Sequence, residues 1–513
     1  MQTLNRPINP VARYAALMLL LLVMLVDMRP AQADLYTATA AFKQRDYAQA
    51  FPQFLALARL GQPVAQLAVA YLYSAGMGTT RSDIDAYAWA RLAAQNGETR
   101  GLTLANKLEP HLALAPGSRK IAAQLTAPYT PAALERTLLP ALTHPAVPSG
   151  EGAAHAPKGA VPNGWGTRSP ASCTPKRFDT SIYPSEAVFR GRQGRFTVRF
   201  TLMPDGTARN PRVVLGLQAP QFDRAARAGV LMARFAHRAP GAQPIRCTIN
   251  LQFVEHQYST DDYPGLQAKL WRMHAIAKQG NPQAETVYGT LLAGLPQVDR
   301  ARQTRFLPWL VKGAQGGDAL AQYEVSVCLQ TSFGGCVPDE AKALRWLHLA
   351  AAQNEPDAEL ALALHALRAA PDAAELAASI RLLGQAVAQG NTAAAAHLAA
   401  LLAASPVATA RDPVRALRLE KKAYKHVAVD PTGDEIRAAA YAAEGHFAHA
   451  VTLERKAIGK ARRLGWTLTP LAQRLVRYQS DKPWYGNLLD YASPAQGPST
   501  PNASHAGDSH AAG

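Results

Sequence analysis

The sequence predicts a multidomain, mainly α protein in which two arms of paired helices, each an α-α superhelical repeat, flank a small α+β domain. An alanine-rich helix ending recurs at a regular interval in the second half of the chain. Apolar residues alternate with polar ones over 196–202 and 245–253, the pattern of half-buried strands. At 513 residues the chain is too long for a single core, so several domains are expected.

The composition narrows the classes of partner. Hydrophobic residues make up 48% of the chain and charged residues 18%, which is typical of packed Ala- and Leu-rich helices. The formal net charge is +17, which bears on partners and solubility and not on the fold. A nucleic-acid interface would need basic residues clustered with aromatic ones, whereas Arg and Lys are scattered here. We therefore expect no nucleic acid as a partner.

The N-terminal segment, residues 1–33, has the three-part organisation of a signal peptide. Two arginines precede an apolar run at 14–26, and Ala31-Gln32-Ala33 follows as a small-residue cleavage site. The run is about 13 residues long, whereas a helix that spans a bilayer needs about 20. We expect cleavage, export to the periplasm and a mature chain that begins at Asp34. The alternative is an uncleaved anchor in the inner membrane, and membrane contact is expected only in that case.

Residues 34–142 are predicted to form an N-terminal helical repeat domain. Gly76-Met77-Gly78 separates two amphipathic segments and allows a tight left-handed turn. Small Ala residues let the two helices approach closely, and the second segment ends at Ala93-Ala94-Gln95-Asn96-Gly97. From Tyr47 to Gly97 the pattern resembles the Sel-one-like repeat, a relative of the tetratricopeptide repeat. This resemblance implies helical hairpins that stack into a solenoid.

The same ending returns in residues 257–490, which we assign to a C-terminal helical repeat domain, Sel-one-like and tetratricopeptide-like. The interval is about 35 to 38 residues, as in helix-pair solenoids. An Ala-rich bundle without repeats is the alternative, and the regular interval favours the solenoid. Near the end, Gly445-His446-Phe447 resembles the second half of a tetratricopeptide repeat. The copies of the ending are Ala277-Lys278-Gln279-Gly280, Ala314-Gln315-Gly316-Gly317, Ala352-Gln353-Asn354 and Ala388-Gln389-Gly390.

Between the arms, residues 173–256 are predicted to form an α+β domain of three strands and one helix. The first strand ends at Pro204-Asp205-Gly206, a turn sequence, and residues 212–215 form the returning strand. Apolar residues at helical spacing over 222–233 predict an amphipathic helix. A third strand follows at 245–253.

This domain resembles the C-terminal domain of the TonB energy-transducer family. The matching residues are Tyr183-Pro184 with Glu186-Ala187, Asp205-Gly206 in the hairpin, and Phe222-Asp223 at the start of the helix. The resemblance implies that a short segment of an outer-membrane receptor pairs with an exposed strand edge, which is β-augmentation. The positions to test are Thr248, Asn250 and Gln252 on the third strand, and the alternative is that they are ordinary solvent-facing residues.

The four cysteines suggest two disulfides in an exported chain. Cys173 precedes the α+β domain and Cys247 lies on its third strand, so a bridge would pin the entry segment to the sheet. Cys328 and Cys336 flank a short loop that a second bridge would close. A zinc site is the alternative, although the cysteines form no C-x-x-C pair and no histidine has ligand spacing beside them.

No group of residues in the sequence supports catalysis. Adjacent carboxylates point apart, so Asp261-Asp262 is expected to cap the following helix. His446 and His449 are three residues apart on a predicted helix, where they are expected to be surface residues of the repeat and not metal ligands. A Gly-rich phosphate loop and a nucleophile elbow are both missing from the sequence. We therefore expect no enzyme, no cofactor and no metal.

Two segments have compositions that cannot form a core. Residues 143–172 are rich in Pro, Gly, Ala and His without periodicity, which predicts a flexible linker. Residues 491–513 are predicted to be a disordered tail.

Together, these features predict a periplasmic protein–protein interaction scaffold whose partners are envelope proteins, including an outer-membrane receptor segment. The alternative is a TonB-like energy transducer for transport across the outer membrane, anchored by an uncleaved N-terminal segment.

Overall fold

The computed structural model describes most of the two helical arms and most of the α+β module. The predicted signal peptide, Asp261-Asp262, the tail, and all of the predicted linker except 161–162 lie outside the described residues. The residues that the structure describes are 34–113, 117–141, 161–162, 173–178, 194–216, 220–239, 242, 244–253, 264–294, 306–331, 334–368, 371–424 and 429–489.

The N-terminal arm is a stack of helices in which neighbours along the chain pack side by side. Gly78, with φ at +69°, lies close to Tyr47, the residue at which the second helix of this arm begins. A Cβ added at Gly78 would be 1.9 Å from the Tyr47 carbonyl oxygen. This contact explains why the repeat has a glycine there. The helices are α2 (Leu35–Lys43), α3 (Tyr47–Arg59), α4 (Pro63–Ala75), α5 (Asp83–Gln95), α6 (Arg100–Ala113), α7 (Ser118–Thr126), the 3-10 turn η1 (Ala127–Tyr129) and α8 (Pro131–Thr137).

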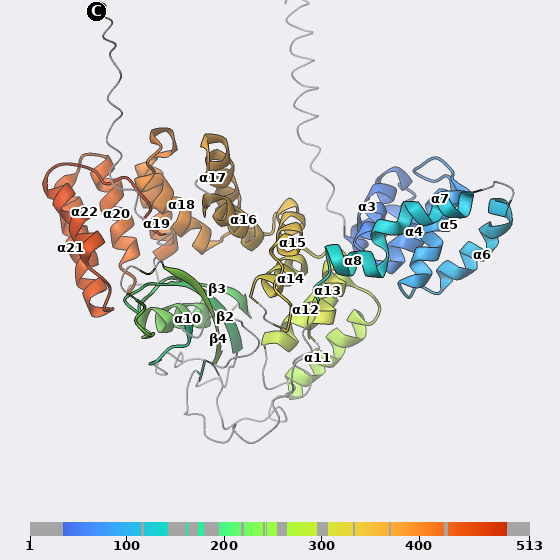
Figure 1. Cartoon of the computed structure of the whole chain (residues 1–513), viewed down its shortest axis with the longest axis horizontal. Coiled ribbons are helices and arrows are strands. Elements are labelled where there is room, and N and C mark those ends of the chain that lie inside the picture. Colours follow the sequence, from blue (N-terminus) through green and yellow to red (C-terminus); the bar gives the residue numbers. More distant parts are fainter. Residues whose placement is uncertain are drawn as a thin grey trace, which may run out of the picture.

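The C-terminal arm forms a curved row of helical hairpins (Figure 1). Polar side chains cap several of its helices, as at Asp339, which accepts from the Lys342 N–H at 3.0 Å. The helices are α11 (Pro264–Ala277), α12 (Pro282–Gly294), α13 (Phe306–Gln315), α14 (Ala319–Thr331), α15 (Glu340–Ala352), α16 (Pro356–Arg368), α17 (Ala373–Ala388), α18 (Thr392–Ala404), η7 (Ala408–Ala410), α19 (Pro413–Tyr424), α20 (Thr432–Ala443), α21 (Phe447–Arg463) and α22 (Thr469–Gln479).

The recurring helix ending has a structural function in the repeats. In three hairpins the residue at the end of the second helix donates from its side-chain amide to a buried Gln or Glu on a neighbouring helix. The pairs are Asn96 with Gln66 at 2.8 Å, Gln353 with Gln322 at 2.9 Å, and Gln389 with Glu359 at 3.1 Å. Each donor precedes a residue with positive φ, namely Gly97, Asn354 or Gly390, which ends the helix.

The two arms contact each other directly, although the α+β module separates them in the sequence. The indole N–H of Trp346 on α15 donates to the Leu138 carbonyl at 2.9 Å. The Leu35 N–H donates to the Gly316 carbonyl at 3.0 Å, which joins the first helix of one arm to a hairpin of the other. Leu138 and Trp346 belong to the same apolar cluster. The repeats are therefore continuous in space across the insertion.

The module contains the three predicted strands and the predicted helix, together with one further short strand. They are β1 (Val161–Pro162), β2 (Gly194–Leu202), β3 (Ala208–Gly216), α10 (Pro220–Met232) and β4 (Ile245–Phe253). The sheet is antiparallel with the order β1-β4-β2-β3, and β1 comes from within the predicted linker.

One face of this sheet packs on α10 and forms the core of the module. Phe196, Val198 and Phe200 from β2 meet Phe222 and Val230 from α10 in that core. Both predicted disulfides are present. Cys173 is bonded to Cys247, and Cys328 is bonded to Cys336. The chain has no other cysteine, so the zinc alternative is wrong.

The module lies on the inner side of the curve that α11 to α22 describe (Figure 1). Its helix α10 contributes Leu231 to an apolar cluster with Trp466 and Leu471 from the last hairpin. Asp205 in the β2–β3 turn accepts from the Thr467 N–H at 2.8 Å and from its hydroxyl at 2.6 Å. Within the described residues, no helix combines the length and the apolarity that a membrane span requires.

Candidate functional site

The second face of the sheet, which points away from α10, carries four arginines. Strand register shows this, because Arg199 pairs with Arg212 on β3, while Thr201 pairs with Arg209 on β3 and Arg246 on β4. Paired residues on neighbouring strands point to the same face, and residues two apart on one strand do so as well. Like charges at directly opposed positions destabilise a sheet, so an Arg199–Arg212 pair needs compensation from elsewhere.

A bulge in β3 brings two of these arginines to the same face. The register between β2 and β3 shifts between Arg199 and Thr201, so Asn210 and Pro211 together oppose a single residue of β2. Asn210 has φ at +48°, a left-handed conformation that Asn tolerates better than most residues. Without the extra residue, Arg209 and Arg212 would point to opposite faces, since they are three positions apart.

The helical arm provides partners for the two arginines of β3. The Arg209 guanidinium lies 3.7 Å from the ring centre of Trp466, a cation–π contact. Arg212 is near Tyr323 and Asp357. Burial lowers the pKa of Arg212, and both of these groups oppose that effect. The Tyr323 hydroxyl also donates to the Val214 carbonyl at 3.1 Å, which holds the outer edge of β3 against α14.

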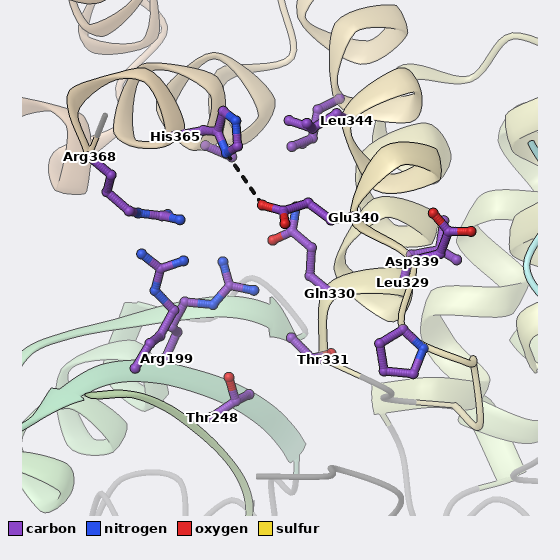
Figure 2. Close-up of a pocket in the computed structure, with 14 residues that line it drawn as sticks. Arg199, Thr248, Leu329, Gln330, Thr331, Asp339, Glu340, Leu344, His365 and Arg368 are labelled. Atoms are coloured by element: carbon purple, nitrogen blue, oxygen red, sulfur yellow. Dashed lines mark ion pairs between the residues drawn. The ribbon is translucent and has the colours of Figure 1, made fainter. Parts of the chain in front are cut away.

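The other two arginines, Arg199 and Arg246, face a pocket between the sheet and helices α14 to α16. Its volume is about 380 Å³. Figure 2 shows Arg199 and Arg368, the last residue of α16, pointing into the same space, with Glu340 and His365 on other walls. The lining residues that matter most for charge are Arg199, Arg246, Arg368, Asp339, Glu340 and His365.

Arg199 is in an unfavourable environment for a cation. Its side chain is buried, and its Nε has no hydrogen-bond partner among the described residues. Burial lowers its pKa to about 9, and the positive charges of Arg212 and Arg246 act in the same direction. Arg368 adds to this effect, and the Tyr323 hydroxyl opposes it.

The carboxylates of the pocket already have partners. Asp339 caps α15 and lies 3.7 Å from the Lys342 ammonium. Glu340 lies 3.7 Å from His365 Nδ1. In the part of the chain that the structure describes, the pocket therefore combines three arginines with two carboxylates, Asp339 and Glu340, which contact Lys342 and His365.

The predicted strand-edge residues occupy different positions. Thr248 is buried and lines the pocket, so it does not face solvent. Asn250 pairs with Thr197 of β2, and Gln252 pairs with Arg195 of β2 on one side and Val161 of β1 on the other. Among the described strands, only β1 pairs with the outer edge of β4, at Leu251 and Gln252. A partner role for this edge stays a prediction.

A second group of ionisable residues lies in the interior of the last repeat. Arg474 on α22 is between Glu454, at 3.0 Å, and Glu435. Burial raises the pKa of both glutamates. All three side chains are buried between α20, α21 and α22, which indicates a packing role for this group. His449 stacks on Tyr441, and no group of three or more metal-binding side chains occurs among the described residues.

The arginine face was not predicted from the sequence. The signal was present in the polar half of the strand alternation, where Arg199 and Arg246 occur. Arg368 follows more than a hundred residues later in the sequence, at the end of helix α16. Only the curvature of the arm brings it to the same pocket.

The family comparisons agree with this architecture. Residues 180–254 match the C-terminal domain of the Gram-negative bacterial TonB protein, and residues 63–98 and 319–355 match the Sel1 repeat. No curated protein matches the sequence significantly.

The solved structures to which this chain is similar include two repeat proteins. A Sel1 repeat protein from Oxalobacter formigenes is 22% identical, with a TM-score of 0.28, and the match covers 39% of this chain and 86% of that one. The protein c5321, described as a protective antigen of uropathogenic Escherichia coli with an SLR fold, is 15% identical, with a TM-score of 0.32, over 85% of this chain and 79% of that one. The chain therefore carries Sel1-type helical repeats and a TonB C-terminal-like domain.

Proposed function

We propose that the protein is an exported, non-enzymatic scaffold of the periplasm that holds envelope proteins together. The observation that carries this proposal is the position of the module within the helical arm. The helices cover the β3 edge of its sheet, where Tyr323 bonds to Val214. The opposite long strand, β4, pairs with another described strand at only two residues of its outer edge. Such an edge is suited to a partner's extended segment, because backbone hydrogen bonds supply the affinity.

Two further features support export and a binding role. Four cysteines form two disulfides, which is consistent with an oxidising compartment. Sel1-type repeats, matched at 63–98 and 319–355, suggest protein–protein interaction, and paired helices make up most of the described chain.

Site-specific photo-crosslinking in cells tests the scaffold. A photoreactive amino acid replaces Asn250, a predicted edge position on β4 that does not line the pocket, and a matched probe replaces Arg381, an exposed residue of α17 outside the pocket. We expect discrete adducts with envelope proteins from position 250 and weaker or different adducts from position 381. If position 250 gives no adduct above the background of an unsubstituted strain, β4 is not the partner edge and the proposal fails.

The second candidate is an energy transducer, which the match of residues 180–254 to the TonB domain favours. The two functions differ in the fate of the N-terminus. N-terminal sequencing of protein from fractionated cells should find Asp34 first, in the soluble periplasmic fraction. Protein that keeps Met1 and fractionates with the inner membrane would support the transducer instead.

A further inference from the structure

We propose that the pocket between the sheet and helices α14 to α16 is a binding site for a small anionic molecule that carries a carboxylate or phosphate group. Three guanidinium groups from separate elements converge there: Arg199 from β2, Arg246 from β4 and Arg368 from the end of α16. Arginine presents planar pairs of N–H donors, which match the two oxygens of a carboxylate or the oxygens of a phosphate.

The contrast between the arginines of this face supports the proposal. Arg209 stacks on Trp466, and Arg212 has Asp357 nearby, so the helical arm provides both with a favourable group. Among the described groups that most affect the pKa of Arg199, none is a carboxylate, although its side chain is 94% buried and Arg212 is directly opposite it in the sheet. A buried cation surrounded by cations is unstable unless an anion compensates it. A bound anion would supply this compensation.

The carboxylates on the far wall do not serve as that anion. Asp339 accepts a backbone hydrogen bond at the start of α15, and Glu340 pairs with His365. In Figure 2 a dashed line joins the Glu340 carboxylate to His365, which is on the same helix as Arg368.

The size of the pocket limits the ligand. A volume of about 380 Å³ is at the lower end for small-molecule sites, so a metabolite-sized anion fits and a folded partner does not. The ligand would contact the module through Arg199 and the helical arm through Arg368. Its binding would therefore strengthen the contact between the two, because it replaces a repulsion with two attractions.

Titration calorimetry on the full mature chain tests this site, with three probes at constant ionic strength. Inorganic phosphate and succinate carry the two candidate anionic groups, and succinamide is a neutral control of similar size to succinate. We expect saturable binding of phosphate or succinate with one site per chain, and none of succinamide. The stronger of the two anionic probes identifies which group the site prefers. Failure of both anions to bind would overturn the proposal.

Two variants locate the site. Arg368→Gln removes a half-buried charge at a helix end and should weaken binding at least about tenfold, as expected for a lost charge-assisted hydrogen bond. Arg381→Gln, an exposed matched control on α17, should bind like the parent chain. Equal affinity for both variants would mean that the anion binds elsewhere and would overturn the proposal.

The Arg199→Met variant distinguishes a role of Arg199 in anion binding from a purely structural role. The change removes a buried charge and keeps an apolar side chain of similar length, so the ligand-free protein should unfold at the same or a higher temperature while anion binding is lost. A lower unfolding temperature without the anion, together with unchanged binding, would contradict the assignment of Arg199. The crosslinking result at β4 does not bear on this site, so the two proposals can fail independently.

Discussion

At the scale of single residues, the fold depends on positions where the backbone or a charge has little freedom. Gly78 and Gly97 both have positive φ, but their surroundings differ. An added Cβ at Gly78 would meet the backbone of Tyr47, whereas nothing lies within 4 Å of the same atom at Gly97. The two glycines therefore separate the cost of a steric collision from the cost of a left-handed conformation.

We predict that Gly78→Ala destabilises the N-terminal arm by more than about 3 kcal/mol, because backbone atoms must move apart. Gly97→Ala should cost only about 1 kcal/mol, the penalty for positive φ. Hydrogen exchange of the α3 and α4 amides measures the difference. Equal protection in the two variants would contradict the close approach.

Glu324 is a buried acid whose ionisation should affect stability. Burial raises its pKa from 4.5 to about 8, and the Thr290 hydroxyl, which donates to both carboxylate oxygens, partly opposes that rise. The folded protein therefore holds this proton more tightly than the unfolded chain. The contribution to the free energy of unfolding is fully present below about pH 4.5 and is lost as the pH rises through about 8.

The Glu324→Gln variant should remove this dependence. We predict that it is more stable than the parent at pH 8.5, by an amount on the order of a few kcal/mol, and similar to it at pH 5. Chemical denaturation at both pH values is the measurement. Glu135→Gln, at an exposed position, should change little at either pH. If the free energy of unfolding of Glu324→Gln depends on pH in the same way as that of the parent, Glu324 does not cause the dependence.

At the scale of elements, the repeat is held by a polar contact that recurs with its period. Gln66 and Gln322 occupy matching positions, and each donates to a carbonyl eight residues earlier while it accepts from the end of the following helix. Buried amides need such partners, since an unsatisfied one costs about 1–3 kcal/mol. The recurring helix ending of the repeats thus links adjacent helices as well as terminating one of them.

Loss of one contact in this series should be measurable. Gln353→Ala leaves the Gln322 carbonyl oxygen without the donor at 2.9 Å, so we predict a loss of about 1–2 kcal/mol in the free energy of unfolding. Gln95→Ala, at an exposed position in the corresponding ending of the first arm, should be nearly neutral. Urea denaturation compares the two, and equal midpoints would show that the contact contributes nothing.

At the scale of the whole molecule, the structure joins the two arms into one row of repeats and places the module inside its curve. Trp346 is fully buried at the junction, where it bonds to Leu138, whereas Trp271, at a comparable place in the repeat pattern, is 73% exposed on α11. The same residue type therefore serves as an anchor at one position and as a surface residue at another, depending on what covers it.

We predict that Trp346→Phe releases the junction, because the Leu138 carbonyl loses its indole donor and a gap remains in the core. Hydrogen exchange should increase in α8 and in the first turn of α15, with a fall in stability of about 1–3 kcal/mol. Trp271→Phe is the matched control and should leave exchange unchanged. Protection of α8 that persists in Trp346→Phe would mean that other contacts carry the junction.

The sequence by itself determined the local elements and their pairing. Period-two alternation predicted β2 and β4, and glycine and alanine spacing predicted the hairpins, because these patterns depend on neighbours in the chain. Cysteine positions predicted both disulfides, of which Cys328–Cys336 closes a short loop and Cys173–Cys247 joins the entry segment to β4 within the module. The returning strand was predicted as 212–215, whereas β3 covers 208–216, since the Asn210 bulge interrupts its alternation.

Only the tertiary structure decided where the surfaces meet. The contact between the arms, the cover over β3 and the meeting of Arg199 with Arg368 depend on the cumulative curvature of many hairpins, and no local pattern encodes that sum. The polar face of a strand looks the same in the sequence whether water or a helical arm covers it. The difference arises from long-range packing, which places the polar face of β2 and β4 in the wall of a charged pocket.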